Sequence, residues 1–198
     1  LSSAASDVYK RQVTHRVNPI MQTCIGPSEE HVSMAGIPTE ASILDMVERA
    51  MPGRVQNVYA HSSGGGKFIA VIQFKKTVPS DEGRQRQAAL LAFSAFPELK
   101  QVILVDEDVD IFDTNDVLWA MTTRMQADVD IVTIPGVRCH PLDPSNDPAC
   151  SWSIRDHGIA CKTIYDATVP FNQKARFQRA KFMEVDVKKF LPDFTVQD

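Results

Sequence analysis

Long hydrophobic runs, paired cysteines and an excess of positive charge are all missing from this sequence of 198 residues. No run approaches the roughly 18 apolar residues that a membrane-spanning helix needs, so a membrane protein is not expected. The chain carries 21 basic and 25 acidic residues, whereas a nucleic-acid-binding protein needs a basic face. The four cysteines form no CxxC pair and match no common zinc pattern, so we expect reduced thiols in a cytoplasmic protein.

The first twelve residues, LSSAASDVYKRQ, have neither a helical nor a strand period and lack the apolar stretch of a signal peptide. They resemble the adaptor-derived sequence that contaminates some shotgun assemblies. We therefore expect residues 1–12 to be a non-native tail and the domain to occupy residues 13–198. The alternative is a disordered natural tail.

What the chain does contain is an alternation of helical patterns and short apolar strands. Helices are expected over residues 39–51, 81–96 and 114–125, and strands over residues 55–61, 67–76, 101–105 and 130–134. This order predicts a layered α/β domain in which helices flank a largely parallel sheet.

Three stretches show no such alternation. Residues 13–37 carry turn residues without a sustained period, so a loop is expected there, followed by a helix that begins at Pro38 and Thr39. Residues 137–170 are rich in Pro, Asp, Ser, Cys and His and predict a second, longer loop. Residues 174–189 mix aromatic and basic side chains, and we expect a helix or extended arm that docks on a neighbouring subunit.

A run of carboxylates follows the apolar strand QVILV, comprising Asp106, Glu107, Asp108, Asp110 and Asp113. Ligands of open α/β sheets bind at the carboxyl ends of strands, and carboxylates at this spacing can hold Mg²⁺ in glycosyl or phosphoryl transferases. The alternative is that Asp113 caps a helix while the others pair with Arg or Lys. The pattern alone leaves both interpretations open.

Lys67, His31 and His140 stand in irregular segments where a side chain can meet a ligand. Lys67 follows three glycines, but the loop lacks GxxxxGK[ST] and leads into a strand, which disfavours a P-loop. It either offers a charge to an anion or ends a hairpin turn. His31 follows two glutamates and His140 lies in RCHPLDP, so each binds or protonates a substrate near neutral pH or is a hydrogen-bonded structural histidine.

A resemblance to the C-terminal part of UbiD-type decarboxylases is carried by the segments CIGPSEEH, GIPTEASIL, VDEDVDIFDTNDVLWAMTTRMQ, IPGVRCHPLDPS and ACKTIYDATVPF. The similarity is to the branch that acts on gallate, protocatechuate and other hydroxybenzoates. It implies a reversible, non-oxidative aromatic carboxy-lyase that uses prenylated FMN, supplied by a flavin prenyltransferase, as its electron sink. The family's Glu–Arg–Glu network and its metal ion belong to an upstream domain, so we expect this fragment by itself to be inactive.

The resemblance also implies roles for four side chains. Lys67 would contact the flavin cofactor. His31 and His140 would hydrogen-bond the ring hydroxyls of the substrate, and Leu142 would form an apolar wall over the ring. The domain would close the pocket and form a homo-oligomer, and the acidic run would be caps and salt bridges. A metal-dependent transferase built on the carboxylates between Asp106 and Asp110, or a non-enzymatic assembly module, stays as the alternative.

Overall fold

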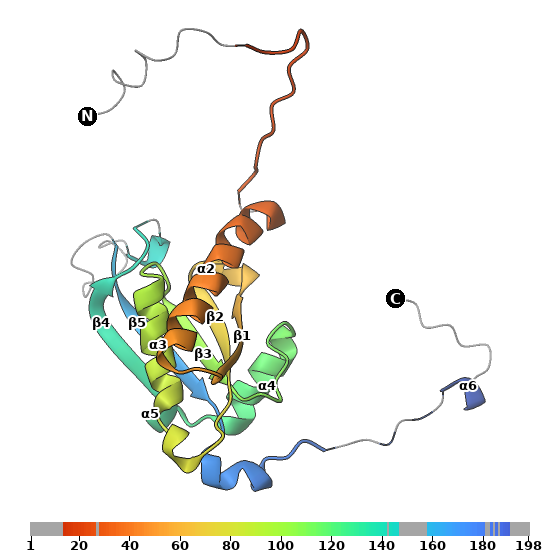
Figure 1. Ribbon diagram of the computed structural model, residues 1–198, viewed down its shortest axis with the longest axis vertical. Coiled ribbons are helices and arrows are strands. Elements are labelled where there is room, and N and C mark those ends of the chain that lie inside the picture. Colours follow the sequence, from red (N-terminus) through yellow and green to blue (C-terminus); the bar gives the residue numbers. More distant parts are fainter. Residues whose placement is uncertain are drawn as a thin grey trace.

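A five-stranded sheet lies between helices on its two faces in the computed structural model (Figure 1). The structure describes residues 14–26, 28–141, 143–146, 158–180, 183, 185 and 187–190. Its elements are α2 (Glu29–Ala50), β1 (Val55–Ala60), β2 (Ile69–Phe74), α3 (Arg84–Ala95), β3 (Gln101–Val105), α4 (Thr114–Arg124), α5 (Ala127–Asp130), β4 (Ile131–Arg138), β5 (Ile159–Ala167) and α6 (Val187–Phe190). The expected α/β class is confirmed. Among these residues no helix has the length and apolar character to cross a membrane.

The strand order across the sheet is β1-β2-β3-β5-β4. The three central strands run parallel, with Ile69 opposite Gln101 and Gln101 opposite Thr163, so their amino ends share one edge. The outer strands β1 and β4 are antiparallel to their neighbours. The sheet is therefore parallel in its centre and mixed at its margins.

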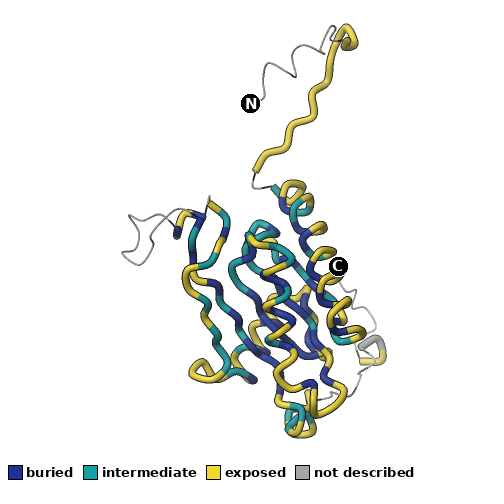
Figure 2. Tube along the Cα trace, turned by 60° about the vertical axis from the view of Figure 1, so that its left-hand side comes forward, coloured by how far each residue is buried: buried dark blue, intermediate teal, exposed yellow. Residues whose placement is uncertain are grey.

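Alternating side chains of the central strands feed two apolar cores. On β2, Ala70, Ile72 and Phe74 join the core under α2 and α3, whereas Val71 joins the core under α4. Burial is concentrated in the strands and in the helix faces that cover them (Figure 2). Strands buried on both faces read as continuous apolar runs, which explains why β2 and β3 were visible in the sequence.

Helix α2 begins at Glu29, so the expected loop over residues 13–37 is wrong in its second half. The hydroxyl of Ser28 accepts a hydrogen bond from the backbone N–H of His31 at 3.3 Å and caps the helix. Pro38 lies inside the helix, and the Thr39 hydroxyl donates to the carbonyl of Ala35 at 2.8 Å. Thr39 is therefore not a cap. Proline is common in the first turn of a helix, so the sequence predicts a start at Pro38. In the folded chain the packing of α2 outweighs the free-energy cost of a proline inside a helix.

Strand β5 overturns the expectation of one long loop over residues 137–170. It is an inner strand of the sheet, between β3 and β4. Its sequence, IACKTIYDA, includes a lysine that hides the strand pattern. Lys162 is nevertheless buried, and its ammonium donates to the carbonyls of Pro97 and Leu99 at 2.7 Å each. Burial of a cation is tolerated here because its hydrogen bonds are satisfied.

Candidate functional site

A groove of about 430 Å³ opens where the amino ends of the central strands meet the first half of α2. It is lined by His31, Met34, Ala35, Pro38, Thr39, Ser42, Lys67, Phe96 and Glu98. Lys67 precedes β2 and Glu98 precedes β3. The groove is therefore at the edge of the sheet opposite to the carboxyl ends where the acidic run was expected to bind a ligand.

Lys67 is presented by a loop that packs directly against α2. Gly66 has a φ of +68°, and a Cβ at this position would lie 2.7 Å from the carbonyl oxygen of Val32. Only glycine allows this approach. The Lys67 ammonium lies 3.7 Å from Oε2 of Glu98, and the two side chains are 32% and 38% exposed. The loop leads into strand β2 and not into a helix, so it is not a P-loop. It joins the antiparallel strands β1 and β2 and therefore closes a β-hairpin that contains a 3₁₀ turn, Ser62–Gly64.

His140 follows β4 and meets the same carboxylate. Its Nε2 lies 3.5 Å from Oε2 of Glu98, and its ring contacts Phe68 edge-on at a centroid distance of 5.6 Å. The backbone carbonyl of His140 accepts hydrogen bonds from the N–H of Asp143 and from the amide of Asn146, both at 3.2 Å. These bonds fix the start of the loop that carries His140.

Asp143 anchors that loop to the sheet. Its carboxylate accepts a hydrogen bond from the Lys100 ammonium at 2.7 Å and two from Ser145. Burial raises the pKa of Asp143, but the hydrogen bonds from Lys100 and Ser145 outweigh burial and leave the pKa below its ordinary value. Asp143 is therefore a carboxylate at neutral pH, and the loop is tied down by a charged pair.

The structure thus gathers three of the four site residues expected from the resemblance. Lys67 and His140 converge on Glu98, and His31 lines the same groove from the first turn of α2. Leu142 lies outside the described residues. Glu98 was not singled out in the sequence, since an acidic residue in a turn between Pro97 and Leu99 carries no pattern of its own.

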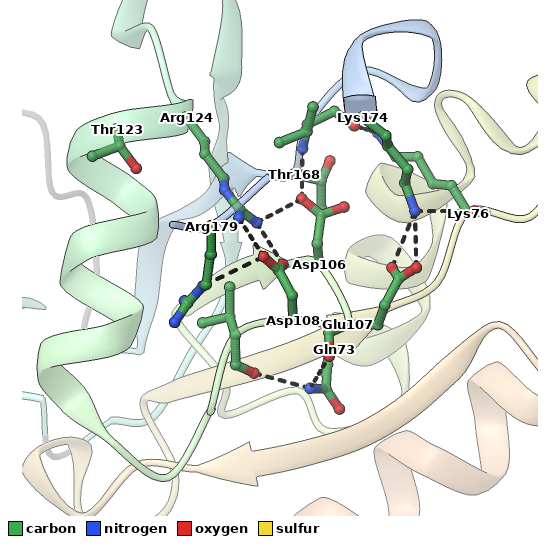
Figure 3. A network of polar contacts seen from close by, with 12 residues as sticks. Gln73, Lys76, Asp106, Glu107, Asp108, Thr123, Arg124, Thr168, Lys174 and Arg179 are labelled. Atoms are coloured by element: carbon green, nitrogen blue, oxygen red, sulfur yellow. Dashed lines mark hydrogen bonds and ion pairs between the residues drawn. The ribbon is translucent and has the colours of Figure 1, made fainter. Parts of the chain in front are cut away.

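The acidic run lies at the opposite edge of the sheet, where its carboxylates pair with arginine and lysine side chains (Figure 3). The guanidinium of Arg124 bonds Asp106 at 3.0 Å and Asp108 at 2.8 and 2.6 Å. Glu107 accepts two hydrogen bonds from Lys174, at 3.0 and 3.1 Å. Hydrogen bonding from Arg124 is the main reason that the pKa of Asp108 is lowered. For Asp106 burial dominates and raises the pKa.

Asp113 accepts a hydrogen bond from the N–H of Asn115 at 2.9 Å and caps α4. With the ion pairs of Arg124 and Lys174, this confirms the interpretation of the run as caps and salt bridges for Asp106, Glu107, Asp108 and Asp113, whereas Asp110 accepts a hydrogen bond from the N–H of Phe112 at 2.9 Å. Within the described part of the chain, no three His, Cys, Asp or Glu residues are grouped so that they could hold a metal ion. The transferase alternative requires the carboxylates between Asp106 and Asp110 as metal ligands, and Arg124 and Lys174 already pair with three of them.

The first part of the expected docking arm packs on its own domain. Arg179 pairs with Asp116 at 2.6 Å and stacks over the ring of Trp119 at 4.1 Å, and Lys174 pairs with Glu107. Farther along, Met183 and Phe190 are exposed. Contact of residues 174–189 with a neighbouring subunit stays a prediction.

The sheet with its covering helices and this groove define a layered α/β domain that can receive a ligand at the amino ends of its central strands. Residues 32–167 match the family described as 3-octaprenyl-4-hydroxybenzoate carboxy-lyase C-terminal domain. The chain belongs to this family, the UbiD family, which confirms the resemblance found in the sequence.

Relatives with known structures or activities cover most of this chain. Gallate decarboxylase from Lactiplantibacillus plantarum is 62% identical over 181 residues, which are 90% of this chain and 37% of that protein. Apo 3,4-dihydroxybenzoic acid decarboxylase from Klebsiella pneumoniae is 61% identical with a TM-score of 0.83, covering 91% of this chain and 37% of that one.

The UbiD-class enzyme HmfF from Pelotomaculum thermopropionicum, in complex with FMN, is 34% identical with a TM-score of 0.77, covering 91% of this chain and 38% of that one. An evolved dimeric form of HmfF in complex with prFMN is 28% identical with a TM-score of 0.66, covering 92% of this chain and 34% of that one. The chain thus spans less than two fifths of the length of these relatives.

Proposed function

We propose that this chain is the C-terminal part of a carboxy-lyase that removes CO₂ from gallate, 3,4-dihydroxybenzoate or a related hydroxybenzoate. The observation that carries the proposal is the groove lined by Lys67 and His31, together with His140, which lies beside it in contact with the groove residue Glu98. The relatives that decarboxylate gallate and 3,4-dihydroxybenzoate support the substrate class.

The groove fits an anionic, aromatic cofactor such as prenylated FMN. Lys67 follows three glycines, is one third exposed and contacts Glu98 only at 3.7 Å, so its ammonium can turn to a phosphate or another anion. Met34 and Phe96 provide apolar wall for a ring system. Bound prenylated FMN would supply the electron sink for loss of CO₂. Its metal ion would be held by the part of the protein upstream of this chain.

The two histidines would recognise the hydroxybenzoate ring. Each imidazole can donate or accept a hydrogen bond at a ring hydroxyl. His140 stands on a loop that charged contacts hold in place, which favours a fixed orientation of the substrate. His31 stands at the start of α2. Leu142, two residues beyond His140, would cover the ring.

The remaining roles follow from the same proposal. The domain would close over the flavin-binding part of the enzyme, form a homo-oligomer and receive a cofactor made by a flavin prenyltransferase. Its cytoplasmic location stays a prediction from the cysteine content.

The test is an assay of the complete protein loaded with prenylated FMN. We expect release of CO₂ from gallate or 3,4-dihydroxybenzoate, and we expect His140→Ala to lower kcat/KM about a hundredfold because the substrate loses an orienting contact. His61→Ala is the matched control, since His61 bonds Thr114 and Ser63 outside the groove. Absence of CO₂ from every hydroxybenzoate would refute the proposal, and full activity of His140→Ala would remove His140 from the site.

The proposed domain boundary has its own test. Sequencing the source DNA across residues 12 and 13 should reveal a reading frame that continues upstream into a flavin-binding domain. A frame that starts near residue 1 would instead favour the assembly module. Light scattering would then be expected to show a stable oligomer that needs no ligand.

A further inference from the structure

We propose that Glu98 is a positioning residue of the hydroxybenzoate site, a role that rests on the function proposed above. Its carboxylate is the one group in the described residues that lies within ion-pair distance of both Lys67 and His140, at 3.7 and 3.5 Å. Lys67 comes from the loop before β2, and His140 follows β4. Glu98 therefore links the cofactor-binding and substrate-binding sides of the groove.

The backbone of the turn that carries Glu98 is fixed by hydrogen bonds on both sides of this residue. Leu99 is fully buried, and the carbonyls on either side of Glu98, those of Pro97 and Leu99, both accept hydrogen bonds from the buried ammonium of Lys162. The backbone N–H groups of Lys100 and Gln101 both donate to the carbonyl of Phe68, at 2.9 and 2.8 Å. The backbone at Glu98 is thus fixed at several points, and its 38% exposed side chain extends from there to Lys67 and His140.

The same turn also fixes the backbone next to His140. The thiol of Cys139 donates to the carbonyl of Glu98 at 3.4 Å, and the ammonium of Lys100 bonds Asp143 on the far side of His140. His140 is thus anchored on both flanks to residues 98–100. The backbones of Glu98 and His140 are consequently held next to each other by the fold, which keeps the carboxylate within reach of the imidazole.

This arrangement gives Glu98 two effects on ligand binding. It orients the ring of His140, and it holds the ammonium of Lys67 toward the groove until an anion competes for it. Removing the negative charge should therefore weaken the alignment of the substrate while leaving Lys67 freer to bind an anion. A variant should lose kcat without a rise in KM, which a general loss of structure would not produce.

The experiment compares Glu98→Gln with Glu107→Gln. Both residues are glutamates with 38% exposed side chains that pair with a lysine, but Glu107 lies at the opposite edge of the sheet. In the complete enzyme we expect Glu98→Gln to lower kcat about tenfold with KM unchanged or lower, and Glu107→Gln to change neither. In this 198-residue chain, ¹⁵N spectra of the histidine rings should show shifted His140 signals in Glu98→Gln only, with His61 unmoved in both variants.

Two results would overturn the positioning role: an unchanged kcat of Glu98→Gln, or His140 ring signals that coincide with those of the parent chain. Failure of the proposed function looks different. There, His140→Ala would keep full turnover, or no hydroxybenzoate would release CO₂, whereas the ring spectra would still report whether Glu98 contacts His140.

Discussion

Arg124 is the cation on which the acidic edge of the sheet depends, and its removal should be costly. The guanidinium is buried and makes three hydrogen bonds, one to Asp106 and two to Asp108. In Arg124→Met the buried carboxylate of Asp106 loses its cation, although the N–H of Val169 still donates to it at 2.8 Å. Breaking a buried pair from one side costs about 3–5 kcal/mol, which is a large part of the 5–15 kcal/mol that stabilises a typical domain.

The assay is urea unfolding of the chain at pH 7, followed by circular dichroism, with Arg49→Met as control. Arg49 pairs with Asp45 at 3.0 Å, but the two side chains are 77% and 60% exposed, so its loss should cost less than about 0.5 kcal/mol. The double variant Arg124→Met with Asp106→Asn should regain about 2 kcal/mol, because no charge is left buried without a partner. A loss below about 1 kcal/mol in Arg124→Met would refute the reasoning.

The deficit of Arg124→Met should also depend on pH with a definite sign. Burial already raises the pKa of Asp106 above its ordinary value of 3.8, and loss of Arg124 raises it further. A carboxyl with a raised pKa in the folded state favours folding at low pH and disfavours it as the pH rises through that pKa. The difference between the variant and the parent should therefore shrink as the pH is lowered from 7 to 4, and a constant difference would contradict this account.

Two further predictions concern the walls of the groove. Gly66→Ala should destabilise the chain by roughly 2 kcal/mol or more and Gly65→Ala by about 1 kcal/mol, since both have positive φ but only the Cβ at residue 66 would strike α2; equal losses in thermal unfolding would contradict this. Asp143→Asn should cost about 1.5 kcal/mol at pH 7 by removing the partner of Lys100. Because the folded pKa of Asp143 lies below 3.8, this contribution is complete above that pH and is lost as the pH falls through the folded pKa, so a penalty that grows as the pH is lowered from 7 would contradict the assignment.

Local patterns were enough to predict the fold class and several of its elements. The apolar runs that became β2 and β3 are buried on both faces, and the end of α2 and the cap of α4 at Asp113 carry ordinary signals. The start of α2 was missed because Pro38 and Thr39 carry an ordinary start signal, whereas the cap at Ser28 became visible only in the structure. Strand β5 was missed because it contains Lys162. This lysine can be buried only because the carbonyls of Pro97 and Leu99, which the folded chain brings close, accept hydrogen bonds from it.

The site divides in the same way. Lys67, His31 and His140 were identified by the resemblance of their segments to a family. That Lys67 and His31 line one groove, and that His140 contacts Glu98 beside it, became visible only in the structure. Glu98 has no sequence signal, because its importance comes from two partners that lie 31 and 42 residues away along the chain.

The sequence by itself therefore determined the fold class and the elements whose helix or strand period is regular, such as β2, β3 and α4, since these periods act over a few residues. It also determined, through its family motifs, which lysine and histidines to examine. Only the tertiary structure decided that the carboxylates after β3 are neutralised by Arg124 and Lys174, and that the groove opens at the amino ends of the strands. Charge pairing of this kind depends on residues brought together from distant parts of the chain, and composition cannot specify which cation meets which carboxylate.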